Sequence, residues 1–134
     1  MKSFLISYAT AFVSMLAIDA VWLSVMAKRF YTPYIGHLLA DAPRFVPAGI
    51  FYVLYIFGMV FFVVSPALAN GASLLKVFLS GALLGLFAYA TYDLTNQATL
   101  KSWPAIVTLV DLAWGALLTG TIAVLAVVVT RMSQ

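Results

Sequence analysis

Three aspartates, Asp19, Asp93 and Asp111, lie inside long apolar stretches of this sequence. An ionised side chain in hydrocarbon raises the free energy, so an acid at such a position is expected to serve a site or a helix–helix contact. Carboxyl groups can orient a polar ligand group, transfer protons, or hold a hard cation such as Mg²⁺ or Ca²⁺. Zinc would require His or Cys ligands, but Cys is absent and the single histidine, His37, lies in a connecting segment. We predict an acidic pocket with neither a metal nor a cofactor.

The three aspartates lie at similar depths below one membrane face. Asp19 comes nine residues before Lys28, and Asp93 comes eight residues before Lys101. Asp111 comes ten residues after Lys101. At 1.5 Å per helical residue these separations are about 13, 12 and 15 Å. We therefore expect the three carboxyl groups to converge on one interior position.

Each aspartate is followed, three residues later, by a side chain that can donate a hydrogen bond. Residues three apart in a helix share a face, so each pair can point into a common interior. Tyr92 flanks the pair on the third apolar stretch. The predicted pocket consists of Asp19, Trp22, Tyr92, Asp93, Asn96, Asp111 and Trp114.

The composition is that of an integral membrane protein. Of 134 residues, 65% are hydrophobic and only 8% are charged, against about 25% in a typical soluble domain. The mean hydropathy is +1.10. The net charge of +3 is small and scattered, which argues against a nucleic-acid partner, and the absence of Cys excludes disulfides and thiolate chemistry.

Four stretches are long enough to cross about 30 Å of hydrocarbon as helices. They cover residues 4–27, 46–69, 74–100 and 103–131, to within a few residues. The first is too long for a signal peptide and carries an aspartate, so we assign it as a helix. The predicted fold is therefore all-α: a polytopic four-helix transmembrane bundle that occupies residues 1–134 as a single domain.

The last three helices are expected to be antiparallel neighbours. Only residues 70–73 and 101–102 connect them, and such short turns join adjacent helices. Gly81 and Gly85 form a Gly-x-x-x-Gly step on the third span. Small residues at this spacing allow two helix backbones to approach closely.

The longer first connection, residues 28–45, contains apolar residues at helical spacing. Thr32–Pro33 suggests an N-cap followed by a first-turn proline. We predict a short helix lying in the membrane interface, with its aromatic rings at headgroup depth. It would serve either as an anchor for the bundle or as a lid over the acidic pocket.

The lysines and arginines favour one orientation by a small margin. Four of them, Lys28, Arg29, Arg44 and Lys101, lie near the first and third connections, and three lie near the opposite ends. The positive-inside rule then places the first and third connections in the cytoplasm. Both termini are expected on the outer side.

Four stretches of the chain carry a family resemblance. They are residues 19–22, 28–31, 90–96 and 110–115, of which Ala-Thr-Tyr-Asp-Leu-Thr-Asn at 90–96 is the most specific. Together they resemble a bacterial membrane family of unknown function, and the resemblance covers nearly the whole chain. It implies a small, multi-pass, four-helix protein of the bacterial inner membrane, and it implies no activity.

Three functions remain open at this point, and the sequence does not decide whether the protein is an enzyme. In the first, Asp93 and Asn96 orient the polar group of a small amphipathic or lipid-derived ligand that the protein binds and could modify. Asp19 and Asp111 would supply acid–base character, with Trp22, Tyr92 and Trp114 as the apolar wall. The second is a proton-coupled carrier working as a homo-oligomer, because four helices make a thin pathway. The third is a structural or accessory subunit whose aspartates only join helices.

Overall fold

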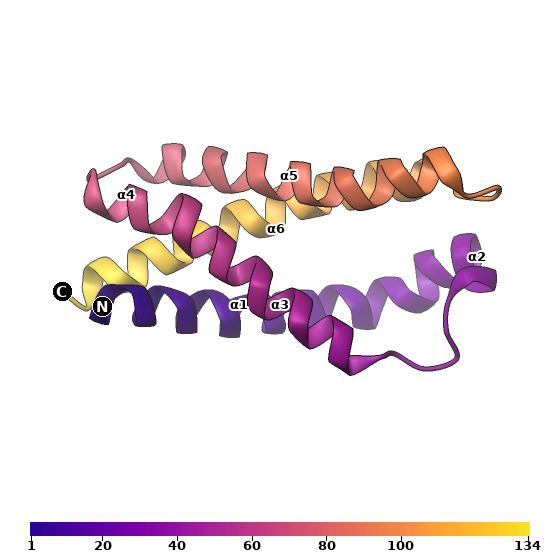
Figure 1. Ribbon diagram of the computed structural model, residues 1–134, viewed down its shortest axis with the longest axis horizontal. Helices are drawn as coiled ribbons and strands as arrows, with labels where there is room; N and C mark the ends of the chain where they lie inside the picture. The colour runs from indigo at the N-terminus through magenta and orange to yellow at the C-terminus, as the bar shows by residue number, and fades with distance from the viewer.

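Four long helical rods run in alternating directions in the computed structural model, which describes all 134 residues (Figure 1). The first rod consists of α1 (Lys2–Met26), a π-helical turn (Ala27–Tyr31), α2 (Thr32–Ile35) and a 3-10 turn (Gly36–Leu38). The second consists of α3 (Phe45–Met59), a π-helical segment (Val60–Val64) and α4 (Ser65–Ala69). The third and fourth rods are α5 (Leu74–Thr99) and α6 (Ala105–Met132). All four are long and apolar enough to cross a membrane, so the chain is an all-α, multi-pass membrane protein.

Both termini lie at one end of the bundle, together with the turn between α4 and α5 (Figure 1). That turn contains Gly71 at φ +58°, a conformation that glycine adopts without a side-chain clash. Ser73 then caps α5, because its side chain accepts a hydrogen bond from the backbone N–H of Lys76 at 3.3 Å. At the opposite end lie α2 and the short turn between α5 and α6.

Both π-helical segments come just before a proline. Ala27–Tyr31 precedes Pro33, and Val60–Val64 precedes Pro66. A proline inside a helix has no N–H to donate, and its ring crowds the carbonyl four residues earlier. A locally wider turn relieves that crowding, so each rod continues past its proline instead of ending there.

The predicted short helix after the first span is present as α2, but its predicted N-cap is wrong. Tyr31 and Thr32 both have helical backbone angles, so Thr32 continues the first rod and does not cap a separate helix. The Thr32 hydroxyl instead donates to the Ala27 carbonyl at 2.8 Å, a carbonyl within the wider turn. The basic pair Lys28–Arg29 therefore lies within a continuous rod and does not end it.

Helix α6 is the centre of the bundle, and α5 packs along it at short range. A Cβ built on Gly85 would lie 2.0 Å from the carbonyl oxygen of Gly115, and one on Gly81 would lie 2.9 Å from the Cβ of Ala123. Only a glycine can fill either position without moving a backbone. The close approach predicted from the Gly-x-x-x-Gly step is therefore confirmed.

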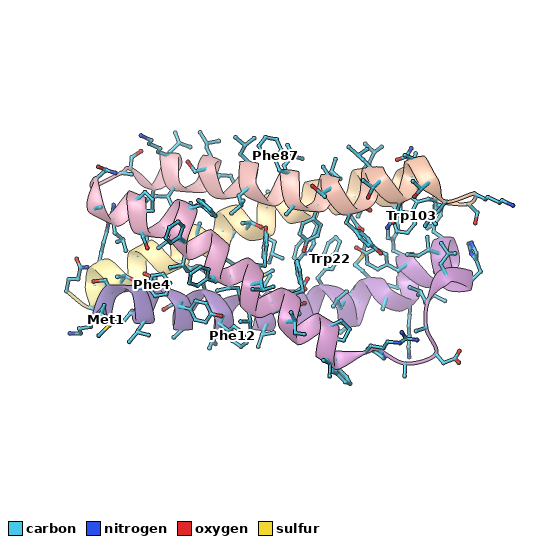
Figure 2. The ribbon with its side chains drawn as sticks, viewed as in Figure 1. Met1, Phe4, Phe12, Trp22, Phe87 and Trp103 are labelled. Atoms are coloured by element: carbon cyan, nitrogen blue, oxygen red, sulfur yellow. The ribbon has the colours of Figure 1, made fainter.

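The half of the bundle nearest the termini is filled by apolar side chains. Met15, Ile56, Met59 and Ile122 are among its fully buried members. Large apolar side chains also cover the outer surface, as expected for a lipid-facing bundle. In Figure 2, Phe87 points away from the helices, whereas Trp22 points into the interior of the bundle, where it lines a cavity.

Candidate functional site

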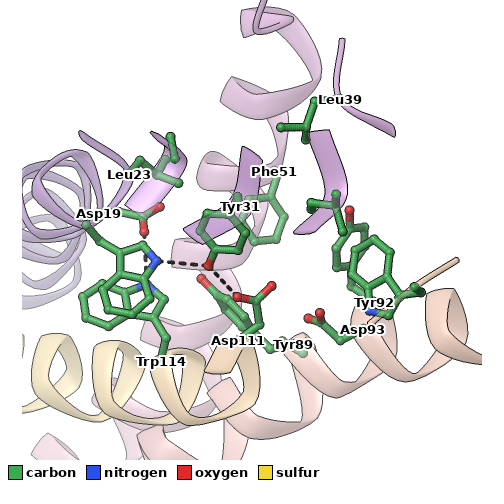
Figure 3. Close-up of a pocket in the computed structure, with 15 residues that line it drawn as sticks. Asp19, Leu23, Tyr31, Leu39, Phe51, Tyr89, Tyr92, Asp93, Asp111 and Trp114 are labelled. Carbon is green, nitrogen blue, oxygen red and sulfur yellow. Dashed lines mark hydrogen bonds between the residues drawn. The ribbon is translucent and has the colours of Figure 1, made fainter. Parts of the chain in front are cut away.

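A cavity of about 600 Å³ occupies the half of the bundle that lies towards α2 (Figure 3). Four separated parts of the chain enclose it: the first rod, α3, α5 and α6 with the residues just before it. Its lining residues are Asp19, Trp22, Leu23, Ala27, Tyr31, Ile35, Leu39, Phe51, Ala88, Tyr89, Tyr92, Asp93, Trp103, Asp111 and Trp114. All three intramembrane aspartates therefore line the same cavity.

Six of the seven residues that the sequence suggested line this cavity, and Asn96 does not. Helix α5 contributes Ala88, Tyr89, Tyr92 and Asp93 to the wall. Trp103 also lines the cavity, and its ring meets that of Tyr92 edge-on with centroids 5.7 Å apart. Asn96 lies about 4.5 Å further along the helix than Asp93, beyond the last residue of α5 that lines the cavity.

Asp19 joins three helices. Its carboxyl oxygens accept hydrogen bonds from the Tyr52 hydroxyl on α3 and, at 3.2 Å, from the Trp114 indole N–H on α6. The residue itself is on α1 and only 7% exposed. Because both oxygens already have donors, this aspartate satisfies its polar atoms by joining helices.

Asp111 accepts a hydrogen bond from a residue of the π-helical turn. The Tyr31 hydroxyl donates to its Oδ1 at 2.5 Å, and the Trp22 indole N–H donates to that hydroxyl at 3.1 Å. These two successive hydrogen bonds connect α1, the π-helical turn and α6 (Figure 3). Tyr31 occupies only Oδ1, so the second oxygen is left to bind another donor.

Asp93 differs from the other two aspartates because no hydroxyl, indole or amide group donates to its oxygens; only the carboxyl group of Asp111 lies within hydrogen-bond reach, and a bond between the two acids needs a shared proton. The residue is 0% exposed at the solvent surface. Its carboxyl group points toward that of Asp111 (Figure 3). A buried acceptor without a donor raises the free energy of the folded state, so its presence requires an explanation.

Aromatic rings form most of the remaining wall. The indoles of Trp22 and Trp114 stack with centroids 4.0 Å apart and planes inclined by 9°. Tyr89, Tyr92 and Trp103 line the side formed by α5 and the segment before α6. All three tryptophans of the chain therefore touch this cavity.

The continuation of the first rod covers one side of the cavity. Tyr31, Ile35 and Leu39 line it from there, and Ile35 is only 6% exposed. The His37 ring lies 2.8 Å from the Ser102 hydroxyl, which ties this segment to the turn between α5 and α6. Of the two roles considered for the short helix, the placement favours a cover over the pocket.

Tyr31, Trp103, Ile35 and Leu39 are pocket residues that sequence reasoning missed. One signal could have found three of them. Every fourth residue of the first rod from Ser7 to Ile35, and Leu39 just after the rod, is buried or lines the cavity; the series is Ser7, Ala11, Met15, Asp19, Leu23, Ala27, Tyr31, Ile35, Leu39. Its persistence past Lys28–Arg29 indicates a continuous helix. No comparable signal marks Trp103.

The ionisable groups with a formal charge at neutral pH in the cavity lining are all acidic. Three carboxyl groups line it, and no Lys, Arg or His does. No set of three or more His, Cys, Asp or Glu side chains is arranged to hold a metal ion. Such a site can accept hydrogen bonds and attract positive charge, and it has no cationic side chain to pair with an anion.

A family model matches most of the chain. A family model described as "Predicted membrane protein (DUF2177)" covers residues 4–128, nearly the whole chain. Searches of curated proteins and of solved structures give no significant match. The family description agrees with the four membrane-length helices.

Proposed function

The chain belongs to the family of predicted membrane proteins DUF2177, and we propose that its cavity binds a small amphipathic or lipid-derived molecule. The polar group of the ligand would lie against Asp93 and Asp111. Its apolar part would lie against the aromatic wall that includes Trp22 and Trp114. We further propose that the protein acts in the bacterial inner membrane, where lipid-like molecules can reach the cavity from the bilayer.

One observation carries this proposal, namely the state of Asp93. An aspartate that only joins helices should have donors, as Asp19 does. Asp93 is fully buried, lines the cavity and has none. Groups held without partners in the free protein are typical of sites that a ligand completes.

The dimensions and composition of the cavity agree with the same ligand class. Small-molecule sites usually occupy about 300–1,000 Å³ and are mostly apolar with a few well-placed polar groups. The present cavity is about 600 Å³, and 12 of its 15 lining residues are hydrophobic. A molecule that was polar throughout would leave most of its hydrogen-bonding groups unpaired there.

The two alternatives are less well supported. A carrier needs a polar path through the whole bundle, but beyond the cavity fully buried apolar residues such as Met15, Met59 and Ile122 fill the interior. A purely structural subunit would explain the hydrogen bonds of Asp19. It would not explain why the same bundle keeps the unpaired carboxyl of Asp93.

The test is to identify what co-purifies with the protein. Wild type, Asp93→Asn and Asp41→Asn would be purified in parallel, extracted into organic solvent and analysed by mass spectrometry. Asp41 lies in the exposed connection before α3, so its variant makes the same chemical change outside the cavity. We expect one amphipathic species enriched with wild type and Asp41→Asn and depleted with Asp93→Asn. Identical extracts from all three proteins would contradict the proposal.

A further inference from the structure

We propose that the ligand carries a primary ammonium group, so that the cavity is a site for an amphipathic amine. This inference rests on the binding function proposed above and assigns the chemistry of the polar end. It is carried by three observations: the charges around Asp93, the number of free acceptor oxygens, and the rings that surround them.

The first observation is the absence of any compensating charge. The carboxyl groups of Asp93 and Asp111 face each other inside the bundle. Two like charges at such a contact repel strongly in a medium of low dielectric constant. A cation or a proton between them removes the repulsion, and no basic side chain lines the cavity to provide the charge.

The second observation is the count of acceptors. Both oxygens of Asp93 lack donors, and Tyr31 occupies only Oδ1 of Asp111. Three carboxyl oxygens at one place therefore have no hydroxyl or indole donor, and the two on Asp93 are also shielded from solvent. A primary ammonium group has three N–H donors and no acceptor, so it can satisfy all three oxygens while neutralising charge.

The third observation is the aromatic surround. Tyr89 and Tyr92 line the cavity on the same helix as Asp93, and Trp103 lines it with its ring edge-on to that of Tyr92. The faces of such rings attract cations, with the strongest effect where water is excluded. The alkyl or aryl part of an amine would lie against the stacked indoles of Trp22 and Trp114.

The same features argue against a ligand whose polar group is an anion, a metal ion or a hydroxyl. A phosphate or carboxylate would meet two carboxyl groups and no Lys, Arg or His. Hard divalent cations such as Mg²⁺ and Ca²⁺ take six or more oxygen ligands, and no group of three or more His, Cys, Asp or Glu side chains is arranged to hold one. A neutral hydroxyl group would supply only one donor for these three oxygens.

Intrinsic fluorescence can test the proposal directly, because all three tryptophans line the cavity. Full-length protein in nanodiscs of zwitterionic lipid would be titrated with hexylamine at neutral pH, where the amine is charged. Hexanol and hexyltrimethylammonium would be titrated in parallel. We expect a saturable change with hexylamine at concentrations where hexanol and the quaternary ion give only a linear partition effect.

Two variants complete the experiment. Asp93→Asn should weaken hexylamine binding by at least about tenfold, because charge-assisted hydrogen bonds are lost, and Asp41→Asn should leave it unchanged. Equal saturation by hexanol, equal saturation by the quaternary ion, or unchanged binding to Asp93→Asn would each overturn the proposal. A neutral amphiphile identified by extraction would overturn the amine assignment while leaving the binding function intact.

Discussion

Trp22 on α1 and Trp114 on α6 stack face to face, with ring centroids 4.0 Å apart and planes inclined by 9°. Each indole N–H serves a different aspartate. Trp114 donates to Asp19 directly, and Trp22 donates to Tyr31, which donates to Asp111. The stack therefore places two separate hydrogen-bond networks side by side, and disturbing one ring should disturb both networks.

The stacked pair should show measurable energetic coupling. In a double-mutant cycle with Trp22→Leu and Trp114→Leu, we expect a coupling of about 0.5–1.5 kcal/mol in the free energy of unfolding, as measured for other aromatic pairs. Reversible unfolding in mixed micelles provides the measurement. The matched control pairs Trp22→Leu with Trp103→Leu, because no ring contact joins those two indoles, and its coupling should be near zero. Equal couplings in both cycles would contradict the stack.

Removing the charge of Asp93 should not weaken the fold. Asp93→Asn removes a buried carboxyl that has no donors, so we expect an unchanged or higher melting temperature. Asp19→Asn weakens two hydrogen bonds that join α1, α3 and α6, and should lower stability by about 1–3 kcal/mol. Thermal unfolding of both variants beside wild type checks the order. A larger loss for Asp93→Asn than for Asp19→Asn would mean that Asp93 is a structural residue.

The hydroxyl of Tyr52 should contribute to stability although it is partly exposed. Tyr52→Phe removes the donor to Asp19 and leaves the ring, so we expect a loss of about 0.6 kcal/mol and at most about 1.7 kcal/mol. The control is Tyr34→Phe, because that tyrosine is exposed and packs only through its ring against Phe30. If both variants unfold alike, the contact between α1 and α3 is weaker than the geometry indicates.

A methyl group at Gly85 should separate α5 from α6. Its Cβ would lie 2.0 Å from the Gly115 carbonyl oxygen and 2.5 Å from the Thr119 hydroxyl, so Gly85→Ala must move a backbone. We expect a loss of folded protein on size-exclusion chromatography. Gly58→Ala is the control, because nothing lies within 4 Å of its added Cβ and alanine favours a helix by about 1 kcal/mol. A stable Gly85→Ala variant would refute the close approach.

The orientation expected from the positive charges can be measured on a background without cysteine. Single cysteines at Ser102 and Ser133 would be exposed to a membrane-impermeant thiol reagent in intact cells and in inverted vesicles. We expect Ser133→Cys to react from outside and Ser102→Cys from the cytoplasmic side. The reverse labelling would invert the orientation but keep both termini together, as the even number of rods requires.

The number of spans could be predicted because hydrocarbon thickness fixes the length of an apolar helix. The path of the chain after the first span could not. A Thr-Pro step is compatible with a helix start and with a proline inside a helix, and only tertiary packing selects between them. Here Tyr31 donates a hydrogen bond to Asp111 on α6 and Ile35 is only 6% exposed, and both contacts stabilise the continuous rod.

The convergence of the aspartates on one cavity could be expected from their distances to Lys28 and Lys101, although Lys28 lies inside the first rod and does not mark its end. The donors to each carboxyl could not, because they depend on how neighbouring helices are rotated about their axes. Tyr31 reaches Asp111 across 80 positions of sequence, and Tyr52 reaches Asp19 from another helix. The distinction between a satisfied Asp19 and an unsatisfied Asp93 is therefore visible only in the folded protein.

The packed apolar half of the bundle has a consequence for the cell that contains it. The recess beside α2 is followed by a packed interior in which Met15, Met59 and Ile122 are fully buried. We expect such a bundle to block ions, so that its expression leaves the membrane voltage unchanged. A ligand bound as proposed would then enter and leave by the same end of the bundle.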